Sequence, residues 1–231
     1  MKKTILSFCL VLTIGLFASQ VFAQQGKFKG IIKYTLKWDG EVPQGAPTTL
    51  DLKVYDQKTT FFDIFSQIPI IINSEAKIVY SLFDFSMIPL EGVTGKWYVR
   101  SKVDDEDIAK NNYEYTSETK VIAGKNAKKV NVTFKSEDGT EKKESIWVCD
   151  EIGPNMDIYY YPGLKGVPFE FTYEFFKYKI TLTATEIIEG KVKEADMILP
   201  TGFEEVTEEE FKEIIKILNE ASGGGQSEDD I

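Results

Sequence analysis

The sequence predicts a mainly β protein: a single strongly curved antiparallel sheet that forms an open half-barrel. One amphipathic helix is expected at the C-terminus and a short helix near residues 104–110. Two observations lead to this fold class. Apolar and polar residues alternate with a period of two along most of the chain, as they do in strands that bury one face. Only the stretch that follows Thr207 repeats its apolar residues with the period of a helix.

The clearest strands are predicted within residues 113–149. Val130 and Val132 alternate there with polar residues, as in a half-buried strand. Asp138-Gly139 follows, and both residue types tolerate the positive φ that a tight hairpin turn demands. The stretch therefore predicts a meander of antiparallel strands.

The first strand is expected from Phe28 to Trp38, with lysines on its outer face. Two more strands are predicted at 50–54 and 59–65, the latter rich in β-branched and aromatic residues. Residues 68–90 are more apolar. This richness fits either strands that are covered on both faces or strands that border a cavity.

Further strands are predicted at 97–99, 167–175 and 178–185. An aromatic loop that contains Tyr159, Tyr160 and Tyr161 precedes the second of them. The alternation slips after residue 185, which indicates a bulge or the end of the strand.

Four consecutive acids begin at Asp104. They suggest either a calcium loop or the start of a short helix, because acids favour the N-terminal end of the helix dipole. The glycine turn and the distal glutamate of a calcium loop are missing, so the helix is expected.

The C-terminal helix has a sequence signature at its start. Thr207 and Glu210 have the spacing of a capping box. Four apolar residues then lie at helical spacing and form a stripe that is expected to pack on the sheet: Phe211, Ile214, Ile215 and Leu218.

The N-terminus predicts export. Lys2 and Lys3 precede an uncharged apolar run and a small-residue cleavage site, so residues 1–23 are expected to be a signal peptide that is cleaved after Ala23. A single domain is expected over 24–221 and a disordered acidic tail over 222–231. The mature chain is thus predicted to be periplasmic or secreted, with no transmembrane segment. Its formal charge falls from −10 to −12 when the leader is removed, which argues against a nucleic-acid partner.

Catalytic chemistry is largely excluded by composition. The chain has no histidine, which removes Ser–His and Cys–His nucleophile pairs and the commonest zinc sites. Cys149 is expected to be a buried free thiol within an apolar strand. We expect no catalytic residue, no metal, no cofactor and no enzymatic activity. Carboxylate pairs are the one catalytic arrangement left open, among the strand residues Glu118, Glu144, Glu170 and Glu174.

Four motifs resemble those of a family of secreted bacterial proteins known as domain of unknown function forty-four-twelve. They read FKGIIKY at 28–34, ETKVIAG at 118–124, TAT at 183–185 and LPTGF at 199–203. That family is similar in layout to the lipoprotein-localisation carriers of the Gram-negative periplasm. The resemblance implies an open half-barrel lined with apolar residues.

Aromatic residues make up 13% of the chain and concentrate in the alternating strands. A curved sheet that one helix cannot fully cover would leave an apolar groove on its concave face, suited to a lipid-like ligand. The alternative is a closed core in a structural or protein-interaction module of the envelope. The residues expected to line the groove are Ile32, Tyr34, Leu36, Val132, Phe134, Phe169, Phe171 and Leu182.

Overall fold

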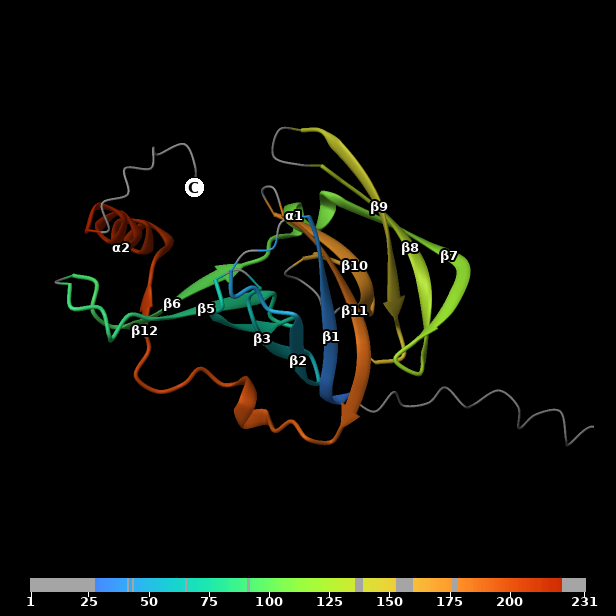
Figure 1. The fold of residues 1–231 in the computed structure, drawn as a ribbon, viewed down its shortest axis with the longest axis horizontal. Coiled ribbons are helices and arrows are strands. Elements are labelled where there is room, and N and C mark those ends of the chain that lie inside the picture. Colours follow the sequence, from blue (N-terminus) through green and yellow to red (C-terminus); the bar gives the residue numbers. More distant parts are fainter. Residues whose placement is uncertain are drawn as a thin grey trace, which may run out of the picture.

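The computed structural model describes residues 28–40, 42, 44–64, 66–90, 92–135, 139–152, 160–175 and 178–221. The expected signal peptide and the acidic tail lie outside them. One twelve-stranded sheet runs through the described residues in the order β12-β6-β5-β4-β3-β2-β1-β11-β10-β9-β8-β7. It curls strongly at the end formed by β7–β11 and β1 and remains open (Figure 1). The mainly β, half-open fold predicted from the alternation is confirmed.

Strands β2–β6 are shorter than β1 and β7–β11, and β12 is the shortest. Their bounds are β1 Lys29–Asp39, β2 Thr49–Tyr55, β3 Lys58–Phe62, β4 Pro69–Asn73, β5 Ile78–Asp84, β6 Lys96–Lys102, β7 Asn111–Ile122, β8 Lys125–Lys135, β9 Glu141–Cys149, β10 Val167–Phe175, β11 Tyr178–Glu189 and β12 Glu204–Val206.

Strand β1 lies between β2 and β11 and behaves as its alternation predicts. Ile32, Tyr34 and Leu36 are buried on the inner face, whereas Thr35 and Lys37 are exposed. Because successive strand residues point to opposite faces, this pattern fixes which side of the sheet is the core side.

The slip predicted at the end of β11 is a β-bulge at Thr185. Lys33 pairs with Glu186 but the next residue, Tyr34, pairs with Ala184, so Thr185 is the extra residue. Its hydroxyl donates a hydrogen bond to the Lys33 carbonyl oxygen, 3.2 Å away. A bulge bends its strand and increases the local twist, which contributes to the curvature of the sheet.

A second bulge lies in β10. Pro168 pairs with Val148 and Glu170 with Trp147, which leaves Phe169 as the extra residue. A proline cannot donate to a strand ladder and is tolerated inside a sheet mainly at a bulge. The sequence Pro168-Phe169 thus creates an irregularity in the middle of the curved part.

The meander of β7, β8 and β9 is confirmed, with consecutive antiparallel pairing. Asp138 lies outside the described residues, but Gly139 has the positive φ expected for this connection, +80°.

The third strand was expected to extend to Phe65 and instead ends at Phe62. The Asp63 carboxylate accepts hydrogen bonds from the backbone N–H and the hydroxyl of Ser66, both at 2.8 Å. An aspartate that bonds to its own following backbone favours a turn over a strand. Phe65 itself lies outside the described residues.

Residues Ile70, Ile71 and Ile72 of β4 are all buried, so this strand is covered on both faces. Ile72 also borders a cavity. The apolar stretch at 68–90 thus contains a strand that is covered on both faces and a residue of that strand that borders a cavity.

Both predicted helices are present. Helix α1 spans Asp105–Ala109, with Asp104 as its N-cap and a capping box to Asp107. Helix α2 spans Glu208–Ala221. The Glu210 N–H donates to the Thr207 hydroxyl at 3.1 Å, and the Thr207 N–H donates to the Glu210 carboxylate at 2.8 Å, which is the capping box expected from the sequence.

Helix α2 lies at the open end of the sheet, away from its curved half (Figure 1). The Phe211 ring packs on Phe83 of β5 with centroids 4.1 Å apart, and Ile214 is buried. The 3-10 helix η1, Glu194–Met197, lies on the segment between β11 and β12. Strand β12 then pairs with β6 in parallel, which is a difference from the wholly antiparallel sheet expected.

Helices α1, η1 and α2 are the helices of the described part of the chain. None of them combines the length and the apolar character that a membrane crossing requires.

Candidate ligand-binding site

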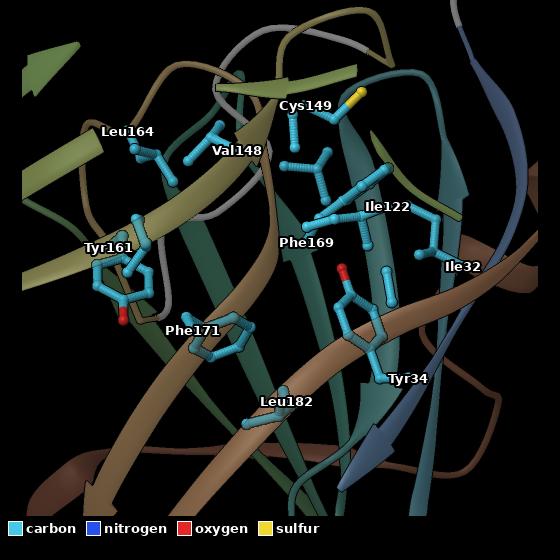
Figure 2. Packing of buried hydrophobic residues seen from close by; sticks show 14 of the residues in the cluster. Ile32, Tyr34, Ile122, Val148, Cys149, Tyr161, Leu164, Phe169, Phe171 and Leu182 are labelled. Carbon is cyan, nitrogen blue, oxygen red and sulfur yellow. The ribbon is translucent and has the colours of Figure 1, made fainter. Parts of the chain in front are cut away.

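The curved half of the sheet encloses the main hydrophobic core. Figure 2 shows Tyr34 of β1 and Phe169 and Phe171 of β10 turned toward one another inside it. The rings of Tyr34 and Phe171 meet edge to face, 6.5 Å apart. The Tyr34 hydroxyl donates a buried hydrogen bond of 2.9 Å to the carbonyl oxygen of Pro168, at the β10 bulge. This bond connects β1 to β10 across the intervening strand β11.

The eight residues predicted to line a groove fall into three groups. Three of them border an apolar cavity: Tyr34, Phe171 and Leu182. Phe134 borders a different pocket, which is more polar. The other four are buried in the main core: Ile32, Leu36, Val132 and Phe169.

The apolar cavity lies on the inner face, between β1–β4 on one side and β10 and β11 on the other. It encloses about 40 Å³. An apolar cavity of about 150 Å³ holds benzene, so this space accommodates no more than a small group unless a wall moves. The lining residues are Tyr34, Leu50, Leu52, Thr59, Phe61, Ile72, Tyr160, Val167, Pro168, Phe171 and Leu182.

Thr59 is the one hydroxyl-bearing aliphatic residue in this apolar wall. It is 1% exposed, and its Oγ1 has no hydrogen-bond partner among the described residues. A buried hydroxyl without a partner costs about 1–3 kcal/mol on mutational scales. A ligand or a water molecule with a polar group at this position would remove that cost.

Tyr160 forms one wall of the cavity. Its ring lies 6.2 Å from Phe61, 5.7 Å from Phe171 and 4.8 Å from Tyr173. It also borders an open cleft of about 600 Å³ that extends toward β6 and α1. A change in the orientation of this single, half-buried ring would therefore connect the apolar cavity to the cleft.

A third space, here called the polar-aromatic pocket, lies on the other side of Tyr160. It has a volume of about 180 Å³ and lies against β8, β9 and β10. Its lining residues are Asn111, Phe134, Lys142, Glu144, Tyr160, Tyr161, Thr172, Tyr173 and Glu174.

Glu144 is a partly buried carboxylic acid in the wall of this pocket. Burial raises the pKa of its carboxyl above the ordinary value, and the negative charge of Glu174 raises it further. A hydrogen bond from the Tyr161 hydroxyl and the charges of Lys142 and Lys179 act in the opposite direction. The net effect is a carboxylate that is less stable when ionised than it would be in water.

This shift predicts how stability depends on pH. Below the ordinary glutamate pKa, Glu144 is protonated in both the folded and the unfolded chain. Its ionisation then contributes nothing to the free energy of unfolding. As the pH rises through the ordinary pKa and then the raised one, ionisation increasingly favours the unfolded chain. Glu144→Gln is therefore expected to raise the Tm at pH 7 and to leave it unchanged below about pH 4, measured by calorimetry.

The matched control is Glu141→Gln, on the same strand, where the side chain is exposed and pairs with Lys143 at 3.1 Å. It should not raise the Tm at either pH. An equal shift for Glu144→Gln at both pH values would contradict the electrostatic explanation.

The other three strand glutamates lie in ion pairs. Glu170 lies 2.7 Å from Lys120, while Glu118 and Glu174 each lie 3.1 Å from a lysine, Lys129 and Lys179 respectively. Cys149 is a buried free thiol, as predicted, and burial raises its pKa.

Sequence reasoning missed the contribution of β2, β3 and β4 to the cavity. The residues concerned are Leu50, Leu52, Thr59, Phe61 and Ile72. The sequence predicted strands at 50–54 and 59–65 and an apolar stretch at 68–90, but it did not show which other strands these segments face. For Tyr160 the sequence carries a signal, because three consecutive tyrosines stand at 159–161.

The chain matches no protein-family model, and no curated protein matches it in sequence. Membership of the family of unknown function thus stays a prediction. Among solved structures the chain is similar to PNGF-II, with 15% identity and a TM-score of 0.54 over 82% of this chain in the C2 crystal form. The chain spans 33% of the length of PNGF-II. This similarity shows a shared fold alone.

A lower similarity connects the chain to the Mycobacterium tuberculosis lipoprotein LppX. It has 14% identity and a TM-score of 0.31 over 73% of this chain and 91% of LppX. A similarity at this level carries no argument about the fold or the ligand.

Proposed function

We propose that the protein is an exported, non-enzymatic binding protein that holds an apolar, lipid-like ligand on the inner face of its curved sheet. The observation that carries the proposal is the Thr59 hydroxyl, which is buried in an apolar wall and has no partner among the described residues. Such a position suits a ligand with an apolar body and one polar atom. The leader predicted at residues 1–23 supports an envelope location.

Entry of the ligand requires Tyr160 to move, because the enclosed space is smaller than one aromatic ring needs. The ring is half-buried and borders the open cleft, so it has room to turn outward. The ligand then replaces the contacts of Tyr160 with Phe61 and Phe171, so little apolar surface becomes exposed.

The first test is binding of octan-1-ol to the folded mature chain, followed by NMR. We expect saturable shifts for residues of the cavity, including Leu52 and Phe171. Leu52→Phe fills the cavity and is expected to abolish binding, since Leu52 is only half-buried and the larger ring is tolerated there. Val121→Phe, at a position that is 69% exposed on β7, is the matched control and should bind as the native chain does.

A second variant examines the role of the hydroxyl. Thr59→Val keeps the shape of the side chain and removes its polar atom. It should weaken binding of octan-1-ol about three- to tenfold and leave binding of octane unchanged. If both probes lose affinity equally, the hydroxyl does not recognise the ligand.

The second candidate is an interaction module with a closed core. It is favoured by the small size of the cavity and by the complete burial of Ile32, Val132 and Phe169. Native mass spectrometry of protein taken from the periplasm without detergent separates the two. A single apo species that also fails to bind octan-1-ol would reject the carrier function in favour of the module.

A further inference from the structure

The polar-aromatic pocket is a second space, which shares the Tyr160 ring with the apolar cavity. Glu144 and Tyr173 line this pocket, and neither borders the apolar cavity. Its volume of about 180 Å³ exceeds the roughly 150 Å³ that is sufficient for benzene. It therefore has room for a compact group without any change of the chain.

Four aromatic residues are among those that line this space: Phe134 from β8, Tyr173 from β10, and Tyr160 and Tyr161 from the loop before β10. The rings of Tyr160 and Tyr173 are 4.8 Å apart and inclined at 64°, so they form a corner and do not stack. The faces of aromatic rings attract cations, and several rings around one space form the kind of cage that binds quaternary ammonium groups.

The charges of the pocket favour the same class of ligand. Glu144 is partly desolvated, so an ionised carboxylate there gains from a bound cation. Two lysines lie near the carboxylates of the pocket: Lys179 is 3.1 Å from Glu174, and Lys142 lines the pocket and is exposed to solvent. An anionic ligand would meet the carboxylates of Glu144 and Glu174. A neutral apolar ligand would desolvate Glu144 further without compensation.

We propose that the polar-aromatic pocket binds an organic ammonium group, held by the faces of Tyr160, Tyr161 and Tyr173 and by the carboxylate of Glu144. The recognised chemistry is a compact cation with a methylated or otherwise weakly hydrated surface. A partly desolvated carboxylate in the wall of a pocket is a candidate binding group. The proposal goes beyond the apolar site, since it concerns a different pocket and a charged ligand.

The test compares choline with 3,3-dimethylbutan-1-ol, which has the same shape and no charge. Both are titrated into the mature chain at pH 7 and followed by NMR. Choline is expected to shift the resonances of residues that line the pocket and to bind at least about tenfold more tightly than the neutral compound. Equal affinity for the two compounds, or the absence of saturable choline binding, would overturn the proposal.

Two variants locate the site. Glu144→Gln removes the charge and Tyr173→Leu removes one ring face, and each is expected to weaken choline binding about tenfold. Glu141→Gln, on the same strand outside the pocket, should bind choline as the native chain does. Unchanged choline affinity in Glu144→Gln would show that the carboxylate is not part of the site.

The two sites share the Tyr160 ring, but each has its own probe and its own variants. Leu52→Phe blocks the apolar cavity but does not touch the polar-aromatic pocket, so this variant should still bind choline. Failure of choline binding with normal octan-1-ol binding rejects only the ammonium site. Failure of octan-1-ol binding alone rejects only the apolar site.

Discussion

Phe169→Ala is expected to lower the free energy of unfolding by about 3–5 kcal/mol, which is a large share of the stability of a typical domain. Phe169 is fully buried and is the extra residue of the β10 bulge. A bulge fixes the backbone around it, so neighbouring side chains have little freedom to fill the space left by the ring. The measurement is urea unfolding followed by tryptophan fluorescence.

The matched control is Phe83→Ala. Phe83 is only half-buried, and it packs on Phe211 at the open end of the sheet, outside the main core. Its loss should cost clearly less than the loss of Phe169. Similar costs for the two variants would mean that the curved half is not the main source of stability.

Tyr34→Phe is expected to destabilise the protein by about 1–3 kcal/mol although it removes a single oxygen atom. The Tyr34 hydroxyl donates to the Pro168 carbonyl at 2.9 Å in the buried core. Without that donor the carbonyl oxygen loses this buried hydrogen bond, and the connection between β1 and β10 is lost with it. Chemical denaturation of the variant gives the difference directly.

Tyr98→Phe is the control for this second result. The Tyr98 hydroxyl bonds to Glu205 at 3.0 Å near the surface, where water replaces the lost partner. Its removal should cost little. A Tyr34→Phe protein as stable as the native chain would mean that the Pro168 carbonyl finds another donor.

Local patterns were sufficient to predict most strands and both helix starts. The alternation around Tyr34 identified its buried face, because a period of two assigns every residue of a strand to one side. The capping residues Thr207 and Glu210 marked the start of α2, because their hydrogen bonds involve only neighbouring residues. The early end of β3 depended on the side chain of Asp63, whose preference for a turn outweighed the strand tendency of the residues after it.

The partners of each face could not be predicted, because they depend on the order of strands in space. Thr59 of β3 and Phe171 of β10 line the same cavity although β2, β1 and β11 lie between these two strands in the sheet. No spacing in the sequence encodes that order. The stripe of α2 was likewise visible in the sequence, but its contact with Phe83 was not.

The position of β1 has a consequence for how the chain reaches its native state. Gly30 pairs with Glu189, near the opposite end of the sequence, so one side of β1 has no neighbour until almost the whole chain is available. Contacts between residues so far apart in the sequence form slowly during folding. Until they form, the unpaired edge of β1 is able to pair with a strand of another molecule. Lys29, Lys33 and Lys37 recur along that strand, and charged side chains on an unpaired edge disfavour pairing with another copy of the chain.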